Sequence, residues 1–476
     1  YTLSLHDALP ILHSFFKLPF YPLLPDDPNF SLQRGRIHEF FKYTKPHRKL
    51  LEELELVIID EISMVRADII DAVDRILRVY SRNLREPFGG KQILLVGDVF
   101  QLEPVVKGDE REILNRFYPT PYFFSARVFG QIDLVSIELQ KVYRQTDSKF
   151  IHVLDHIRNN TVGSAELQLL NTRYGTQIEQ SEADMYITLA TRRDNVDYIN
   201  DKKLAELPGD PVTFYGEIMG DFPESSLPTS QELVLKPGAQ IIFIKNDFDR
   251  RWVNGTIGVI SGFDPIEETL YVITDDGKEC DVKRESWRNI RYKYNEEKKQ
   301  IEEEELGTFT QYPVRLAWAI TVHKSQGLTF SRVVIDFTGG VFAGGQAYVA
   351  LSRCTSLEGI QLKKPISRAD VFVRPEIVSF SERFNNRTAI DRALKQAQAD
   401  VQYVAAAKAF DKGDFGTFLD EFFKAIHSRY DIEKPNVQRL IRRKLNIINR
   451  LKEENRALKQ AALEKEKALV KYARRS

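Results

Sequence analysis

The stretch LELVIIDEISM, from Leu54 to Met64, decides the fold class of this chain. Val57 to Ile59 form a continuous apolar run, which is typical of a strand buried on both faces of a parallel sheet. The run ends in two carboxylates, Asp60 and Glu61, and from Met64 to Tyr80 apolar residues recur at helical spacing. The order strand, acid pair, helix predicts an α/β fold. Its acids should lie at the carboxyl end of a strand, where open α/β sheets bind ligands.

A second unit of the same kind follows in GGKQILLVGDVFQLEPVV, residues 89–106. Ile93 to Val96 are expected to form another buried strand, with Asp98 and Gln101 after it. A solvated turn after a strand explains either polar segment taken alone. Asp-Glu-x-Ser after one strand and Gly-Asp-x-x-Gln-x-x-Pro after the next make a far more specific pattern.

The composition bounds the class of protein. With 476 residues, 42% of them hydrophobic, the chain can bury several cores, and usual domain sizes predict roughly three domains. Its 68 basic residues balance its 68 acidic ones, so any nucleic-acid surface must be local. Cys280 and Cys354 lack metal-ligand spacing, and no apolar run approaches the roughly 18 residues that span a bilayer. We expect a soluble cytoplasmic protein with no membrane partner, in a bacterial-type cytosol or nucleoid, with nucleus and mitochondrion left open.

Two longer motifs lie in the second half of the chain. YPVRLAWAITVHKSQGLTF covers residues 312–330, and GGQAYVALSRCTSLEGI covers residues 344–360. They resemble motifs V and VI of superfamily 1 helicases, the two strand units resemble motifs II and III, and LQKVYRQ at 139–145 resembles motif IV. LHSFFKLPF at 12–20 looks like motif Ia of the PIF-type (petite integration frequency) branch of superfamily 1B, related to RecD. The chain therefore resembles this branch from residue 12 to about residue 366.

The resemblance implies an α/β fold of two RecA-like parallel-sheet domains. We expect the first over residues 12–150 and the second over 151–231 and 308–366. A small SH3-like β insert is expected at 232–307, and a helical extension at 367–476.

Turn chemistry supports the β insert. Asn-Gly at 254–255 and Asp-Gly at 276–277 favour tight turns between short strands near 240–244, 256–260 and 270–273. The acidic stretch EEKKQIEEEE, 296–305, is expected to be a solvated hairpin. The insert is either a barrel without a direct role or, as the resemblance implies, a clamp over DNA.

In this family ATP is held between the two RecA-like domains. Mg²⁺ prefers oxygen ligands and keeps several waters, so Asp60 is expected to hold it through water, and Glu61 to orient and deprotonate the attacking water. Gln101 can sense the γ-phosphate without neutralising it, Arg144 is expected to reach the phosphates, and Arg353 to enter on domain closure. These five residues are the expected catalytic set. The expected nucleotide-binding set is Asp60, Gln101, Arg144, Gln326, Gly327 and Arg353.

The resemblance also implies movement 5′ to 3′ on single-stranded DNA. The expected DNA-binding residues are His13, Ser14, Phe15, Trp252, Thr321, His323 and Lys324. Phe15 could equally be a core aromatic. Trp252 follows Arg250 and Arg251, which suits base stacking combined with phosphate contact.

The C-terminal segment is basic. Residues 434–476 hold 14 Lys/Arg against 4 Asp/Glu on a helical pattern, with apolar or small residues on alternating four-three spacings over 437–469. Three interpretations stay open: an amphipathic helix docked on its own domain, a short coiled coil for self-association, and a tail that binds DNA or a protein partner.

The first residues, YTLSLHDALPI, raise a separate question. One reverse translation of residues 1–11 is a common short-read sequencing adapter, so we expect an artefact there and biological sequence from about Leu12. The Gly-Lys pairs at 90–91 and 277–278 do not complete a Gly-x-x-x-x-Gly-Lys-Ser/Thr phosphate loop. We therefore expect the 476-residue chain alone to hydrolyse ATP negligibly, and adapter-trimmed genomic reads to show that loop upstream in frame.

The full protein is expected to be an ATP-dependent DNA helicase in DNA repair, recombination or genome maintenance, telomere maintenance included. One alternative is a nucleic-acid-stimulated ATPase that remodels RNA or protein–DNA complexes. Another is a catalytically inactive DNA-binding scaffold, which the complete set of expected catalytic residues argues against.

Overall fold

The computed structural model describes residues 2–5, 8–19, 21–27, 37–106, 108–176, 185–295, 300–429 and 435–473. The chain divides into two compact units. Unit 1 comprises Tyr1–Leu134 with Leu139–Arg383, and unit 2 comprises Val135–Glu138 with Phe384–Ser476.

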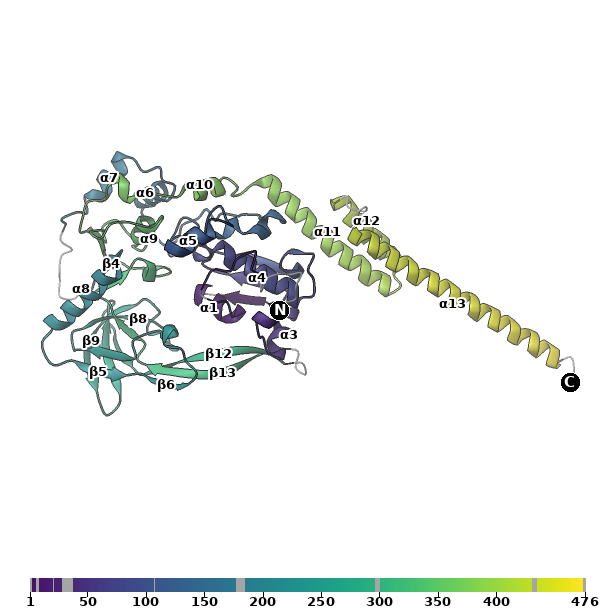
Figure 1. The fold of residues 1–476 in the computed structure, drawn as a ribbon, viewed down its shortest axis with the longest axis horizontal. Helices are drawn as coiled ribbons and strands as arrows, with labels where there is room; N and C mark the ends of the chain where they lie inside the picture. Colours follow the sequence, from purple (N-terminus) through teal and green to yellow (C-terminus); the bar gives the residue numbers. More distant parts are fainter. Residues whose placement is uncertain are drawn as a thin grey trace. The chain divides into compact units, whose positions relative to one another are not determined.

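Unit 1 begins with a parallel sheet of three strands in the order β1-β2-β3 (Figure 1). The strands are β1 (Thr2–Leu5), β2 (Leu56–Ile59) and β3 (Gln92–Leu95). The associated helices are α1 (Ala8–Phe16), α2 (Ile37–Phe40), α3 (Lys45–Glu53), α4 (Ala67–Tyr80) and α5 (Gly108–Leu114). The positions of the two strands and the long helix are confirmed, because β2, β3 and α4 lie where the apolar periodicity placed them. The expected burial of the second strand is wrong, since the residues of β3 are exposed or half-buried and Leu94 is 47% exposed. The reason is that β3 is an edge strand of this sheet.

The expectation that residues 1–11 stand apart from the fold is wrong for residues 2–5 and 8–11, while residues 1, 6 and 7 lie outside the described ones. Thr2–Leu5 form β1, which pairs in parallel with β2, and α1 begins at Ala8. The physical reason is the open edge of β2, since its unpaired backbone groups accept any short extended segment. That an adapter encodes residues 1–11 therefore stays a prediction.

A second parallel sheet has the order β15-β4-β16-β17. Its strands are β15 (Ala319–Thr321), β4 (Ile187–Ala190), β16 (Val333–Asp336) and β17 (Ile360–Leu362). The accompanying helices are α6 (Ser148–Arg158), α7 (Ser164–Asn171), α8 (Arg193–Glu206), α9 (Gln346–Ser352) and α10 (Pro375–Ser381). Every residue of β4 and β16 is buried, as expected for strands covered on both faces. The expected α/β fold with two parallel sheets is thereby confirmed.

Between α8 and β15 lies the β insert. Its five-stranded antiparallel sheet runs in the order β11-β10-β9-β8-β14. The strands are β8 (Gln240–Phe243), β9 (Ile257–Asp264), β10 (Thr269–Thr274), β11 (Glu279–Val282) and β14 (Val314–Leu316). β5 (Val212–Tyr215) pairs with β7 (Glu232–Leu235), and β6 (Glu217–Gly220) pairs with β13. The three expected strands are confirmed, but the predicted bounds 232–307 are too narrow, because partners from both sides complete the sheets.

A long antiparallel hairpin extends from the β insert. It consists of β12 (Glu285–Asn295) and β13 (Gln300–Gln311), which confirms the expected hairpin, although residues 296–299 lie outside the described ones. β12 contacts α3 of the first sheet's region, and Figure 1 shows the hairpin reaching it. The hairpin therefore joins the β insert to α3, which lies more than 200 residues earlier in the chain.

Unit 2 is a helical bundle made of α11 (Arg387–Asp411), α12 (Phe415–Arg429) and α13 (Pro435–Ala473). Ala399, Tyr403, Ala425 and Val437 form its buried core. The extension starts near residue 384 and not at 367, because Phe380 stacks on Phe124 of unit 1 with ring centroids 4.4 Å apart. Among the described residues, no helix combines the length and apolar character of a membrane-spanning segment.

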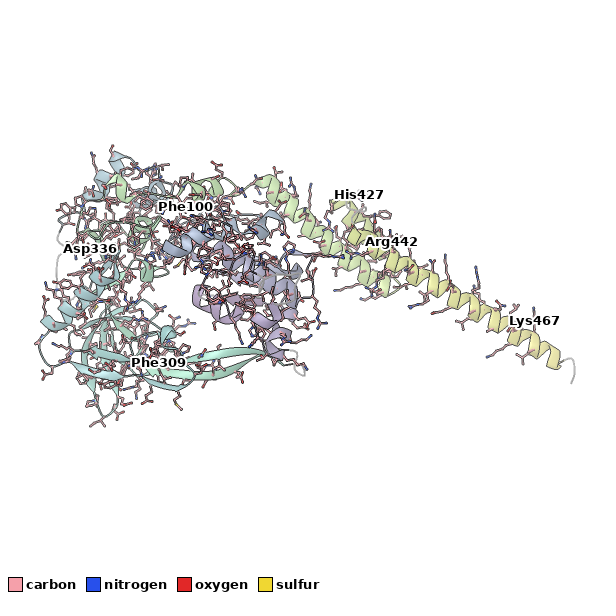
Figure 2. All side chains as sticks on the ribbon, viewed as in Figure 1. Phe100, Phe309, Asp336, His427, Arg442 and Lys467 are labelled. Carbon is pink, nitrogen blue, oxygen red and sulfur yellow. The ribbon has the colours of Figure 1, made fainter. Side chains whose placement is uncertain are left out.

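The start of α13 docks within unit 2. Val437 is buried, and Lys444 pairs with Asp411 and lies over the ring of Phe410. From Leu451 on, the described side chains of α13 are exposed, and Figure 2 shows Lys467 pointing away from the helix. The helix thus combines a docked base with an exposed, basic distal part.

Candidate functional site

The acid pair stands in a strained turn at the carboxyl end of β2. Glu61 adopts the left-handed conformation, with φ 49° and ψ 43°, and its N–H donates to Asp60 Oδ1 at 2.9 Å. Residues other than glycine hold this conformation at a cost of about 1–3 kcal/mol, so the surroundings must impose it. The following 3-10 turn, Ile62–Met64, is fixed because Ile62 N–H donates to Val96 O at 3.0 Å.

Gly97 brings the second strand directly against that turn. Its φ is +150°, and a Cβ at this position would lie 2.9 Å from Ile62 N. Only glycine allows the backbone to approach so closely, which explains the residue between the strand and Asp98. Asp98 Oδ1 accepts from Phe100 N–H at 3.1 Å and lies 3.6 Å from Arg158 Nε on α6. The two acidic segments expected from the sequence are therefore adjacent.

Residues of the second sheet meet this edge of the first. Gln326 Nε2 donates to Gln101 Oε1 at 3.3 Å, across more than 200 residues of sequence. Arg374 donates to both carboxylate oxygens of Glu103, at 3.1 and 3.2 Å. The expected γ-phosphate sensor and the expected motif V glutamine thus come together at the junction of the two α/β regions.

Gly345 forms the closest approach across this junction. It has φ +78°, and a Cβ built on it would lie 2.2 Å from Gln101 O and 2.4 Å from Phe100 O. Sequence reasoning missed this contact, although a Gly-Gly pair before the motif VI helix is a local signal for it.

We predict that Gly345→Ala separates α9 from the Phe100–Gln101 backbone, because the added methyl group overlaps two carbonyl oxygens. The melting temperature should fall by several degrees, about 2 kcal/mol in unfolding free energy. Differential scanning calorimetry measures this change. Gly340→Ala is a matched control, since Gly340 also has positive φ, +79°, but nothing within 4 Å of its Cβ position. Equal losses in both variants would show that backbone strain alone acts.

Two arginines interact electrostatically with Glu61. Arg353 is 1% exposed, and its guanidinium donates to Val349 O, Leu328 O and Ser352 Oγ at 3.1, 3.3 and 3.0 Å. Burial and the nearby Arg144 lower its pKa to about 10, an effect opposed in part by Glu61. Arg144 donates to Ser352 O at 3.3 Å, and burial also lowers its pKa. Both groups stay cationic at neutral pH, which concentrates positive charge beside Glu61.

The motif V segment follows β15. Lys324 N–H donates to Thr321 Oγ1 at 3.2 Å in the turn His323–Ser325, and Gly327 has φ +75°. Burial and the proximity of Arg315 and Arg193 lower the pKa of Lys324. These two arginines were missed from the sequence, because strand β14 and helix α8 bring them here from distant positions. Together they form a local basic patch, which we call the motif V patch, comprising Arg193, Arg315 and Lys324.

Comparison with known proteins gives a consistent result. The model of the PIF1-like helicase family matches residues 10–168. The ATP-dependent DNA helicase Pif1 of Campylobacter jejuni is 32% identical over 359 residues, which cover 72% of this chain and 76% of that protein. The chain belongs to the PIF1-like helicase family.

Other comparisons agree with this assignment. The human ATP-dependent DNA helicase PIF1 is 35% identical over 321 residues, 64% of this chain and 45% of that protein, so the chain spans about half the length of that relative. The structure of Bacteroides Pif1 in complex with ADP-AlF4 matches with TM-score 0.70 and 38% identity, covering 80% of this chain and 85% of that one. Bacteroides Pif1 bound to ssDNA matches with TM-score 0.57 and 39% identity, covering 79% and 84%.

Two of the residues expected on the DNA path are core residues in this PIF1-like fold. Phe15 is 4% exposed and packs edge-on against Phe16 at 4.9 Å. Trp252 is 5% exposed, stacked on Phe243 at 4.4 Å, with the Arg251 guanidinium 4.6 Å from its ring centre. Stacking on a base requires an accessible ring face, so both DNA assignments are wrong for this structure. Half-buried His13 and exposed Ser14 on the same helix as Phe15 remain candidates.

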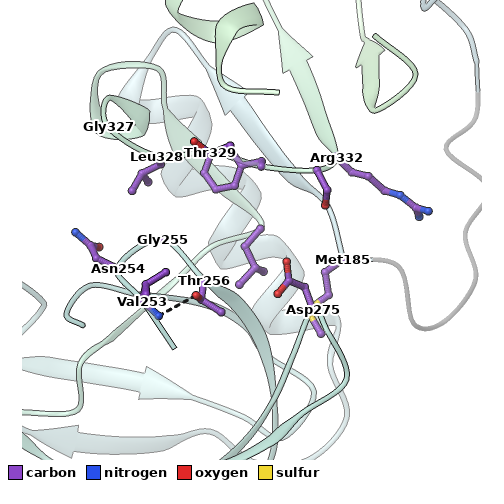
Figure 3. Close-up of a pocket in the computed structure, with 13 residues that line it drawn as sticks. Met185, Val253, Asn254, Gly255, Thr256, Asp275, Gly327, Leu328, Thr329 and Arg332 are labelled. Carbon is purple, nitrogen blue, oxygen red and sulfur yellow. Dashed lines mark hydrogen bonds between the residues drawn. The ribbon is translucent and has the colours of Figure 1, made fainter. Parts of the chain in front are cut away.

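A pocket of about 340 Å³ lies between the β insert and the C-terminal end of motif V (Figure 3). Asn254, Gly255 and Thr256 line one side, and Gly327, Leu328 and Thr329 line the other. Gly255 has φ +97°, and a Cβ there would lie 2.8 Å from Leu328 Cδ2. The carbonyl oxygen of Leu328 also accepts a hydrogen bond from Arg353. The β insert therefore packs on a residue that holds the motif VI arginine. Of the expected site residues, Gly327 alone lines this pocket.

Proposed function

We propose that this protein is an ATP-dependent DNA helicase that translocates 5′ to 3′ along single-stranded DNA in repair, recombination or genome maintenance. The observation that carries the proposal is the junction of the two sheets. There Arg144 and Arg353 interact electrostatically with Glu61, and Gln326 contacts Gln101. The names of the relatives, and the ADP-AlF4 and ssDNA in the two Bacteroides structures, support the same function.

The residues at the junction fit ATP and Mg²⁺. Asp60 presents a carboxylate at a strand end, and hard oxygen ligands are those that Mg²⁺ prefers, with water completing its shell. The ion would supply charge neutralisation at the phosphates. Glu61 would accept the proton of the attacking water, and Gln101 with Gln326 would contact the γ-phosphate. Arg144 and Arg353 would stabilise negative charge on the phosphoryl oxygens, while Gly327 leaves room for the nucleotide.

The test is activity in a chain that carries a family phosphate-binding loop in frame before Leu12. We expect ATP hydrolysis stimulated by single-stranded DNA, and unwinding of a duplex with a 5′ tail but not of one with a 3′ tail. Stronger stimulation by RNA would favour the remodelling ATPase. DNA binding without hydrolysis would favour the scaffold.

For the DNA interface we propose the motif V patch together with Thr321 and His323, and His13 and Ser14 at the other domain. Burial lowers the pKa of His323, so this ring is neutral at pH 7 and contacts DNA without charge.

We predict that Lys324→Ala weakens binding of single-stranded DNA by the 476-residue chain, because the exposed ammonium neutralises a phosphate. The slope of log K against log salt should become shallower by about 0.7. Fluorescence anisotropy at several salt concentrations measures it. Lys202→Ala is the matched control, since this exposed lysine lies on α8 in an ion pair with Glu206. An unchanged slope for Lys324→Ala would remove the patch from the DNA path.

We also propose that the exposed part of α13 contributes to DNA binding, with self-association or a protein partner through 437–469 as the alternatives. Deleting 451–476 leaves the docked base intact and removes 8 Lys/Arg and 4 Asp/Glu. The slope of log K for DNA binding against log salt should become shallower, by a few units at most. If the slope stays unchanged while the mass measured by light scattering falls, the helix serves oligomerisation instead.

A further inference from the structure

Three side chains of the types that ligate metal ions meet on α6 and α7. Among the described residues, His152, His156 and Glu166 each offer one ligand atom, and these atoms lie within 4.8 Å of one another. The two histidines are four residues apart on α6, so they share one face of the helix, and their ring centres are 4.2 Å apart. Glu166 approaches from the first turn of α7.

Hydrogen bonds orient two of these ligands. His156 Nδ1 lies 3.3 Å from Thr161 O, in the turn that joins the two helices. When Nδ1 carries the proton and donates to this carbonyl, Nε2 has the lone pair that a metal ion needs. A hydrogen bond from a ligating histidine to a backbone carbonyl is a regular support of protein metal sites. Glu166 Oε2 accepts from Gly163 N–H at 2.9 Å, which fixes the carboxylate at the start of α7.

His152 and Glu166 of the cluster line a hollow accessible to solvent. This hollow of about 450 Å³ is lined by residues of α6 and α7, among them Lys149, His152, Val153 and Glu166. A hydrated ion can therefore enter from solvent, and water can complete its coordination.

We propose that His152, His156 and Glu166 bind a divalent transition-metal ion, with Zn²⁺ as the best match. Two imidazoles and one carboxylate are a Zn²⁺ donor set that leaves a fourth position for water, whereas Mg²⁺ and Ca²⁺ prefer oxygen ligands alone. In a tetrahedral site the ligand atoms are about 3.4 Å apart, so side-chain rotation must shorten the longest present separation, which is within 4.8 Å, by at most about 1.4 Å. The bound ion joins α6 to α7.

The test is calorimetric titration of the 476-residue chain with Zn²⁺ near neutral pH, with Co²⁺ absorption as a report on tetrahedral coordination. We expect one site whose affinity falls by about tenfold or more in His152→Ala, His156→Ala and Glu166→Gln. Lys149→Ala removes a cation from the same hollow without removing a ligand. This variant should bind Zn²⁺ at least as tightly as the parent. His427→Ala, on α12, is the control for an unrelated histidine and should bind like the parent.

The outcomes are distinct. Binding that is lost in the three ligand variants and kept in the two controls supports the site. No binding by the folded parent, or equal affinity in the parent and all three ligand variants, overturns it. Circular dichroism checks the fold of Glu166→Gln, since Glu166 also caps α7.

Discussion

Replacing Arg353 by alanine is expected to lower kcat for ATP hydrolysis by about 10³-fold while nucleotide affinity changes little. The buried guanidinium interacts electrostatically with Glu61 and Arg144, and its three hydrogen-bond acceptors are neutral oxygens that leave its positive charge uncompensated. We expect this charge to reach the phosphoryl oxygens when the two α/β regions close on the nucleotide. A group supplied by the second α/β region acts mainly on charge that develops in the transition state. Steady-state ATPase kinetics and nucleotide binding are measured in a chain that carries a phosphate-binding loop.

A second variant separates chemistry from packing. Arg353→Lys keeps the positive charge and most of the buried volume, but lysine lacks the planar fork that contacts two oxygens at once. The Arg353→Lys variant should therefore lose most of the ATP hydrolysis activity, while its melting temperature stays close to that of the parent. If nucleotide affinity is lost and turnover is retained, Arg353 serves binding and not the transition state.

Replacing Glu61 by glutamine is expected to lower kcat by about 10²–10⁴-fold, because glutamine cannot accept the proton of the attacking water. The substitution preserves the size of the side chain in its left-handed turn, so binding of DNA should be unchanged. Single-turnover hydrolysis measures the chemical step directly. Glu112→Gln, an exposed glutamate on α5, is the matched control. Hydrolysis by Glu61→Gln within a few-fold of the parent would exclude this residue as the general base.

Periodicity alone located the strands and helices that carry the site. The apolar runs before Asp60 and Asp98 predicted the positions of β2 and β3, because such runs are typical of strands in parallel sheets. They did not predict burial, since β3 is an edge strand with exposed and half-buried residues. The same argument placed α4, whose apolar residues recur at helical spacing. Motif spacing in the sequence also identified the residues from the second sheet, since their order along the chain is itself the signal.

The bounds of the β insert needed the tertiary structure. β5, β6 and β14 lie outside the predicted range of 232–307, and each completes a sheet by pairing with a strand inside it. Strand pairing joins residues that are distant in sequence, so turn signals predict the hairpins but not the edges.

What the sequence determined by itself is therefore the set of elements and the residue types at their ends. The tertiary structure decided which side chains are accessible and which polar groups meet. Phe15 and Trp252 have aromatic side chains of the kind that stack on bases, yet neighbouring residues cover their rings. Glu61, Arg144 and Arg353 come together only because two sheets meet. A local pattern reports the face that a residue presents on its own helix or strand, whereas burial depends on the element that packs against that face.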